Sequence, residues 1–138
     1  MNDNEINEAI AKACGWKLKS KKFKSTNAAY RTGYRYERGS EAACSGGECH
    51  GWGWSNTPES AAMHLPPYCT DLNAMHEAEK NLTEWHKYRY AINEIVWNQR
   101  DKKTGIAESI IHATARQRAE AFLRTKGLWK VSCEDETK

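Results

Sequence analysis

The sequence predicts an α/β (α+β) fold in which a small central sheet is flanked by helices. One observation is a segment that predicts a strand running into a helix. The β-branched Ile110 and Ile111 favour the strand, and Thr114 and Gln117, which follow shortly, can form a capping box at the start of the helix. A second is the alternation of Tyr and Arg within residues 30–36, which is typical of a strand. The third is that apolar residues recur at helical spacing in several stretches.

The helix that follows Thr114 is the most strongly determined element. Its apolar residues fall at i, i+4, i+7 and i+8 and form one stripe, made of Ala115, Ala119, Phe122 and Leu123. Gly127 can adopt the left-handed conformation that ends a helix. A similar Gly and Trp combination, Gly15 and Trp16, follows a predicted helix from about Asn4 to Cys14. Both helices are expected to fold a Trp back over their last turn.

The first half of the chain is expected to supply the rest of the sheet. Five lysines lie within residues 17–24, which predicts a solvated loop or an edge strand kept soluble by charge, with a phosphate-binding patch as the less frequent alternative. Residues 30–36 form a strand with aromatic residues on one side and arginines on the other. Residues 39–58 are rich in Gly and Ser and form a loop or hairpin, in which residues 50–55 can make a short strand.

The second half is predicted to be mainly helical. A helix begins at about Tyr68, with Thr70 or Asp71 as its cap, and a break near Leu82 separates it from a helix that ends at about Trp97. Residues 98–105 form a charged turn, and residues 106–111 form the strand that leads to Thr114. We therefore expect one α/β domain at 1–130, with the insertion at about 39–58 and a flexible tail at 131–138.

Composition limits the possible classes of protein. The net charge is +3, a mild bias rather than the strong basicity of a dedicated nucleic-acid binder. Charge alone does not decide, and nucleic acid, an unlikely partner, is kept as the weaker alternative, whose sign would be an affinity that falls steeply with added salt. No apolar run approaches the ~18 residues of a membrane span, and the N-terminus lacks the pattern of a signal peptide, so a cytoplasmic location is expected. The five cysteines, an odd number, are interpreted as reduced thiols.

The start of the last helix is a candidate phosphate site. A helix N-terminus offers free N–H groups and partial positive charge, and nearby arginines add to both. The phosphate-binding candidates are His112, Thr114, Arg116 and Arg118. An alternative is that Thr114 is only a cap and the arginines form a solvated helix face.

Aromatic residues supply the second half of the predicted site. Six Trp and six Tyr against two Phe favour partly wet binding surfaces over deep cores. Trp52, Trp54 and Tyr34 are the candidates for stacking on a base, and Arg35 and Lys22 could assist them. The alternative is a plain edge strand.

The sequence gives little indication of catalysis or of a cofactor. Cys44, Cys49 and His50, with His64 or Cys69, lack the paired spacing of a zinc site, so neither a metal nor a cofactor is expected. No catalytic residue is assigned. The enzymatic alternative is a nucleotide phosphodiesterase that uses His112 or His76 as acid or base.

Three stretches carry a resemblance to a known family. They are residues 67–80, residues 113–124 with the Gly-Leu-Trp that follows at 127–129, and the Cys-Gly-Trp-Lys at 14–17. They resemble the small phage and prophage proteins of the phage ABA sandwich domain family and cover about half the chain. The resemblance implies a layered helix-sheet-helix sandwich and a phage or prophage origin, without implying a reaction.

The functional expectation combines the predicted binding site with this family resemblance. The chain is expected to be a phage-encoded, non-enzymatic homo-oligomer in the host bacterial cytoplasm that sequesters a small anionic nucleotide. The ligand could be a cyclic nucleotide signal of an anti-phage defence system, in which case the protein acts as a sponge. The alternatives are a protein–protein inhibitor of a host defence protein and the phosphodiesterase.

Overall fold

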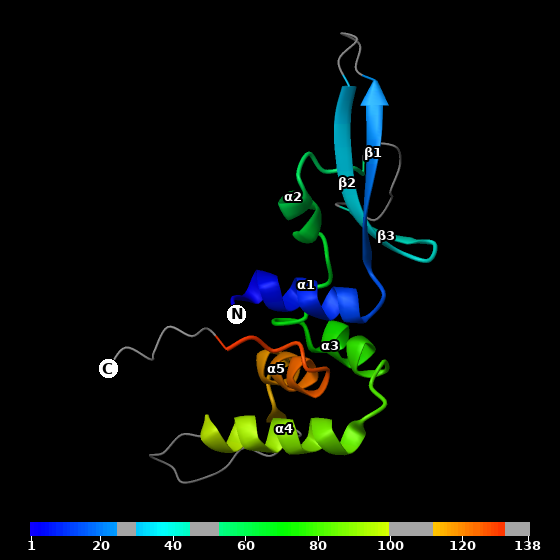
Figure 1. The fold of residues 1–138 in the computed structure, drawn as a ribbon. Coiled ribbons are helices and arrows are strands. Elements are labelled where there is room, and N and C mark those ends of the chain that lie inside the picture. The colour runs from blue at the N-terminus through cyan, green and yellow to red at the C-terminus, as the bar shows by residue number, and fades with distance from the viewer. Residues whose placement is uncertain (25–29, 45–52, 100–111, 132–138) are drawn as a thin grey trace, which may run out of the picture. The chain divides into compact units, whose positions relative to one another are not determined.

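The computed structural model describes residues 1–24, 30–44, 53–99 and 112–131, and Figure 1 shows the order of the elements along the chain. The predicted α+β class is confirmed, because the chain forms a three-stranded antiparallel sheet together with helices. The fold divides into two compact units, one made of Met1–Ile10 with Pro67–Lys138 and the other of Ala11–Pro66. Helix α1 (Asp3–Ala13) begins in the first, and its last turn belongs to the second.

The sheet lies in the Ala11–Pro66 unit. Strands β1 (Lys17–Lys24), β2 (Tyr30–Arg38) and β3 (Glu41–Ala43) are antiparallel in the order β1-β2-β3, and the register places Lys17 opposite Glu37 and Lys24 opposite Tyr30. Ser55 pairs with Tyr34 through two backbone hydrogen bonds of 2.8 Å. Residues 17–24 were predicted to be a loop or an edge strand, and the edge strand is confirmed.

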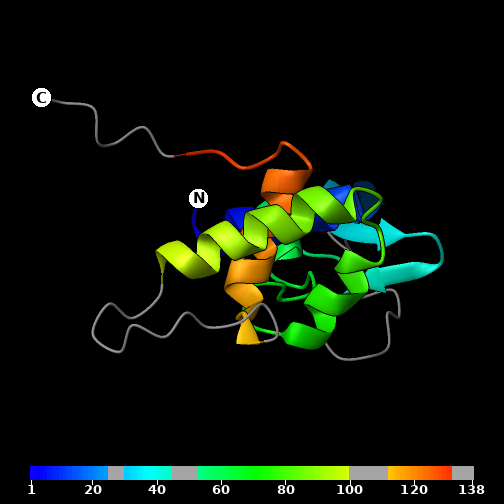
Figure 2. The same ribbon diagram turned by 90° about the horizontal axis from the view of Figure 1, so that it is seen from below.

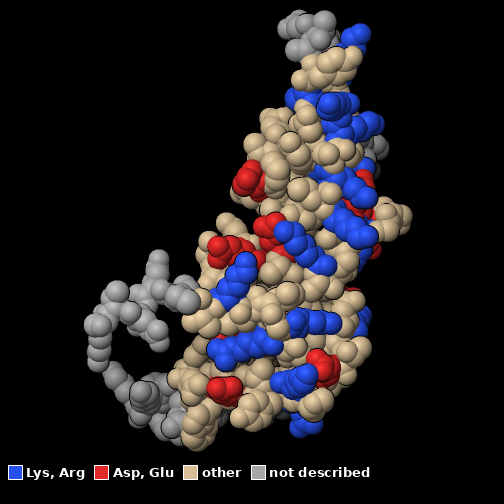
Figure 3. All heavy atoms as spheres, in the orientation of Figure 1, with Lys and Arg blue, Asp and Glu red and all other residues tan. Residues whose placement is uncertain are grey.

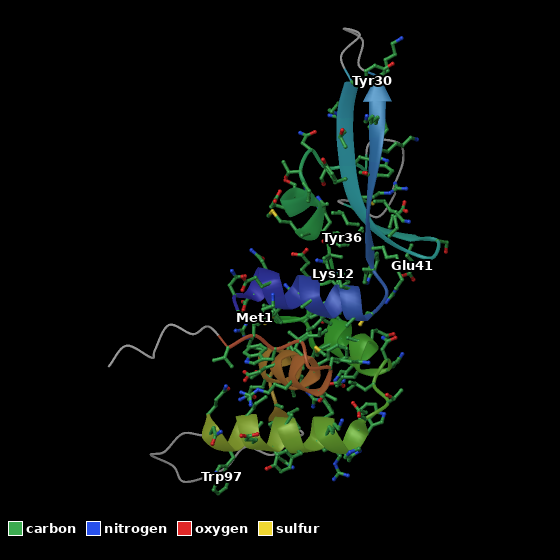
Figure 4. The ribbon with its side chains drawn as sticks, viewed as in Figure 1. Met1, Lys12, Tyr30, Tyr36, Glu41 and Trp97 are labelled. Atoms are coloured by element: carbon green, nitrogen blue, oxygen red, sulfur yellow. The ribbon has the colours of Figure 1, made fainter. Side chains whose placement is uncertain are left out.

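A short helix covers part of β2. Helix α2 (Pro58–Ala62) packs against this strand, with the Thr57 side chain as its cap and Pro58 in its first turn. The sequence prediction missed this helix, although a Thr-Pro pair at a helix start is a known signal. Tyr36 is 1% exposed at one end of β2, while Tyr30 at the other end is 72% exposed (Figure 4).

The other unit is helical. Helices α3 (Leu72–Glu79), α4 (Trp85–Asn98) and α5 (Ala115–Thr125) pack around a core that includes Met75, Ile92, Phe122 and Leu123. Figure 2 shows α4 crossing α5. The predicted break near Leu82 is confirmed, since α3 ends before it and α4 begins after it. None of the helices that the structure describes combines the length and apolarity needed to cross a membrane.

Helix α5 forms as the sequence predicts. The Thr114 hydroxyl accepts from the Gln117 backbone N–H at 3.2 Å, and the Gln117 side chain accepts from the Thr114 backbone N–H at 2.9 Å, which completes the capping box. The predicted apolar stripe is buried throughout. Residues 106–111, predicted to be the preceding strand, lie outside the described residues.

Helices α1 and α5 end in the same way. Gly15 and Gly127 have φ of 92° and 71°. The next residue in each case donates its N–H back across the turn, Trp16 to Ala11 at 3.0 Å and Leu128 to Leu123 at 2.8 Å. These bonds satisfy carbonyls that the helix leaves unpaired. Trp16, the residue after the Gly, is buried, whereas Trp129 is half-buried.

Replacing Gly127 should test this helix end without a steric clash, since no atom lies within 4 Å of an added Cβ. We expect Gly127→Ala to lower the free energy of unfolding by about 1–2 kcal/mol, because a Cβ is strained at this φ. Gly127→Asn should cost less, because Asn tolerates the left-handed region. Urea unfolding followed by circular dichroism measures both, and equal losses for Ala and Asn would contradict the backbone explanation.

Candidate functional site

One face of the β1–β2 hairpin gathers cations and rings. Because side chains alternate along a strand, the register places every second residue of each strand on this face. We call it the basic hairpin face, and it consists of Lys17, Lys19, Lys21, Phe23, Arg31, Gly33, Arg35 and Glu37, with Trp54 packed over it.

Trp54 lies on the hairpin because β2 has a glycine beneath it. A Cβ added at Gly33 would come within 2.7 Å of the Trp54 Cβ and 2.8 Å of a Phe23 ring carbon. The Trp54 and Phe23 rings meet edge to face with centroids 5.7 Å apart. Gly33 therefore leaves the space that both rings occupy.

Cations stack on these two rings. The Arg35 guanidinium lies 4.2 Å from the Trp54 ring centroid, and its Nε and Nη2 donate to Glu37 at 2.8 and 2.6 Å. Arg31 lies over the Phe23 ring at 6.0 Å. Such contacts hold a guanidinium in a fixed orientation while leaving its outer side able to meet a flat ring or a phosphate.

The strands concentrate positive charge. Together β1, β2 and β3 carry eight Lys and Arg side chains against two Glu, although the whole chain has a net charge of only +3. All five β1 lysines are exposed, and within the described residues none of them forms a salt bridge. Figure 3 shows Lys and Arg atoms following β1 along the hairpin. The lysines are therefore available to an anion.

The residues predicted to stack on a base, and the two cations predicted to assist them, do not all lie on the same face of the hairpin. Arg35 and Trp54 are brought together on the basic hairpin face. Tyr34 and Lys22 lie on the opposite face by the alternation of the strands, where Tyr34 is half-buried and Lys22 is exposed. Trp52, the remaining stacking candidate, lies outside the described residues.

The predicted phosphate-binding residues at the start of α5 mostly make internal contacts. Thr114 forms the cap, and His112 is exposed. Arg116 pairs with Asp3 through Nη1 and donates from Nη2 to the Met1 carbonyl oxygen at 3.2 Å. Arg118 donates to the Glu79 carboxylate at 3.1 Å and to the Ala113 carbonyl oxygen at 3.3 Å.

Arg118 belongs to a buried polar cluster that joins α3, α4 and α5. Glu79, at 6% exposure, accepts hydrogen bonds from the Arg118 guanidinium and the Tyr88 hydroxyl, and its other oxygen lies 3.0 Å from His76 Nδ1. Burial, and then the hydrogen bond to Glu79, raises the pKa of Tyr88, so its hydroxyl stays protonated and donates. Buried charges are held in this way when every polar atom has a partner.

The cysteines correct one expectation. Cys14 and Cys69 are reduced thiols, as predicted, but Cys44 is disulfide-bonded, so the prediction of five reduced thiols is wrong for Cys44. An odd cysteine count does not report whether two particular thiols are close in the fold. Burial raises the pKa of the Cys69 thiol, which disfavours the nucleophilic thiolate there.

Two further features bear on chemistry. Among the described residues, no group of three or more His, Cys, Asp and Glu side chains is placed to hold a metal ion. A shallow cavity of about 320 Å³ in the helical unit is lined by Arg124, Gly127, Trp129 and Val131. Arg124 is already paired with Glu120 at 2.5 Å, so this cavity offers a ring but no unpaired cation.

Comparison with known proteins adds no assignment, since no protein-family model, curated protein or solved structure matches this chain. The resemblance to the phage ABA sandwich domain family therefore stays a prediction that rests on the sequence stretches alone.

Sequence reasoning missed part of the basic hairpin face. Lys17, Lys19, Lys21, Phe23 and Arg31 belong to it and were not named as binding residues, although a phosphate-binding patch was one alternative for residues 17–24. The signal was present in the two-residue period of residues 17–23, once these residues are treated as a strand. Pairing that strand in register with residues 30–38 would have placed Phe23 opposite Arg31.

The Gly33 contact predicts a steric penalty. Gly33→Ala should lower the free energy of unfolding by about 1–3 kcal/mol, because the new methyl overlaps the Trp54 Cβ, which is fixed to the backbone. In a Trp54→Gly background the overlapped Cβ is absent, so the penalty should be smaller. Urea unfolding of the four proteins measures the difference, and an unchanged penalty in that background would show that Trp54 does not lie on Gly33.

The two arginines of α5 should differ in their effect on stability. Arg118→Ala leaves the Glu79 carboxylate buried without its cation and should cost about 3–5 kcal/mol. Arg116→Ala removes an exposed pair with Asp3 and should cost about 1 kcal/mol or less. Thermal and urea unfolding compare them, and similar losses for both variants would contradict a structural role specific to Arg118.

Proposed function

We propose that this protein binds an anionic nucleotide ligand without altering it, and that the basic hairpin face is the binding surface. The observation that carries the proposal is the Arg35 guanidinium stacked at 4.2 Å on Trp54 beside exposed lysines. A nucleotide presents a flat base and a phosphate, which are the two groups that such a surface recognises.

The internal contacts of the α5 arginines favour the basic hairpin face, rather than the start of α5, as the binding surface. Arg116 and Arg118 already hold carboxylates of their own chain, and releasing Arg118 would leave Glu79 buried and unpaired. The β1 lysines would give up no such contact among the described residues. An anion therefore meets less competition at the hairpin.

Binding rather than catalysis fits the contacts of His76, one of the two histidines proposed for a phosphodiesterase. His76 contacts the Glu79 carboxylate, which is itself held by Arg118 and Tyr88, so this pair serves packing of the helices. His112 is exposed at the start of α5. With the resemblance to phage proteins, this supports sequestration of a nucleotide signal of host defence, in which the ligand is held and returned unchanged.

A second candidate is a protein-binding surface on α4, because large aromatic side chains are exposed there. Trp85, Tyr90 and Trp97 are 47%, 74% and 57% exposed, and Trp97 projects from the last turn of α4 in Figure 4. Tyr and Trp are enriched in the centres of protein interfaces. This surface suits the alternative of an inhibitor of a host protein.

Nucleotide titration separates the two candidates. We expect a panel of cyclic dinucleotides and short oligonucleotides to give binding heat with the wild-type protein. Trp54→Ala should weaken that binding by about tenfold, since a lost stacking contact is worth about 1–3 kcal/mol. Trp85→Ala, which removes an exposed Trp from α4, is the matched control and should bind as the wild type does.

Two results would contradict the proposal. One is the absence of binding across the whole panel, and the other is an equal loss in the Trp54 and Trp85 variants. Recovery of the bound ligand by heating, followed by chromatography, tests whether it is intact. A cleaved product would favour the phosphodiesterase.

A further inference from the structure

We infer that the ligand of the basic hairpin face is a single-stranded nucleic acid rather than a lone nucleotide. The inference rests on the proposed function, because it concerns the same surface. It goes further in naming a polymer whose phosphates lie along β1 and whose bases meet the rings of Phe23 and Trp54.

The cations form a line. Lys17, Lys19 and Lys21 are alternate residues of one strand, so their side chains leave the same face at intervals of about 6.6 Å. The phosphate of a single nucleotide can contact one or two of these ammonium groups. A chain of phosphates can contact all of them, and each contact releases a counterion.

The rings continue this surface on the neighbouring residues. Phe23 follows Lys21 on the same face, and the Lys21 ammonium lies 5.4 Å from its ring centroid. The Trp54 ring is the next one along, with its centroid 5.7 Å away. The two ring planes are inclined at 65° to each other, so each ring can stack on a separate unpaired base of a flexible strand, which is a sequence-tolerant mode of binding.

Exposure distinguishes a polymer from a small ligand. Sites for small molecules bury about 70–90% of the ligand surface. Here the β1 lysines are exposed, and Phe23 and Trp54 are half-buried on a sheet face. A ligand on such a surface keeps one side in water, so only a long ligand accumulates enough contacts. Because the stacking groups need access to base faces, an unpaired strand fits better than a duplex.

The local charge also supports a polyanion. The strands carry eight cationic side chains against two carboxylates, so the rest of the chain is net negative. Glu37 and Glu41 are paired with Arg35 and Arg38 at 2.6 and 2.8 Å, which leaves the lysines to set the field of β1. The net charge of +3 conceals this concentration.

Fluorescence anisotropy with oligothymidylates of about 4 to 16 nucleotides, the range of site sizes of small single-strand-binding folds, tests the inference. Affinity should rise with length. With salt, the logarithm of the binding constant should fall with a slope of about −2 to −3, as expected for three or four phosphate contacts to a single strand.

The chain offers a matched pair of variants for this experiment. Replacing Lys17, Lys19 and Lys21 by Gln should reduce the salt slope by about 2, since each lysine accounts for about 0.7. The control is Lys22→Gln with Lys24→Gln, which removes lysines of the same strand from its opposite face. In this control, the change in the salt slope per replaced lysine should be less than half of the change per lysine in the triple variant. Both sets are exposed, so circular dichroism should show the same fold.

Each contrary outcome is distinct. If a cyclic dinucleotide binds as tightly as the longest oligonucleotide and depends equally on Trp54, the proposed function stands and this inference fails. An equal slope change per lysine in the control would assign binding to general charge and overturn it, as would equal affinity for a duplex or for vesicles of anionic lipid. If no nucleotide of any length binds, both proposals fail.

Discussion

The absence of a side chain at Gly33 is the constraint on which the arrangement of the hairpin depends. A Cβ there would overlap atoms of Trp54 and Phe23, so both rings pack on β2 only because that position is glycine. A glycine inside a strand weakens the strand, and close approach of another group is a common reason for it. Once Trp54 lies there, its ring gives Arg35 a surface to stack on, and Glu37 fixes the other side of that guanidinium.

The cationic side chains differ in how firmly carboxylates of the same chain hold them. Arg118 balances a buried carboxylate, so its charge is committed to the packing of three helices. Arg35 is intermediate, since Glu37 orients it while part of it remains exposed. The β1 lysines are exposed and form no salt bridge among the described residues. An anionic ligand is therefore expected to bind most readily at the β1 lysines, because among the described residues it has no salt bridge to displace there.

Sequence reasoning succeeded where one local rule decides the structure. The capping box of Thr114 and Gln117 and the stripe through Phe122 placed α5 correctly, because both depend only on the spacing of nearby residues. The left-handed glycines Gly15 and Gly127 ended two helices for the same reason. The alternation of Tyr and Arg in residues 30–36 placed β2, and together with these helices it predicted the α+β class.

Sequence reasoning was less complete where the structure depends on contacts between residues far apart in the sequence. Trp54 and Gly33 are separated by a segment without a regular pattern, so the sequence alone could not show that one packs on the other. Arg118 looked like a free helix-face cation because its partner Glu79 lies on another helix. Helix α2 has five residues, too few to show a hydrophobic period, and only its cap and proline indicate it.

The lysines of β1 satisfy two requirements at once. An edge strand presents unpaired backbone groups, and lysines along it prevent pairing with a second chain. That requirement is met by lysines on either face, and β1 carries them on both, at Lys22 and Lys24 as well as at Lys17, Lys19 and Lys21. It does not account for Gly33, which lets Trp54 pack on the face that carries Phe23, Arg31 and Arg35. The glycine and the Trp54 that packs over it, rather than the number of lysines, therefore separate a binding surface from a protected edge.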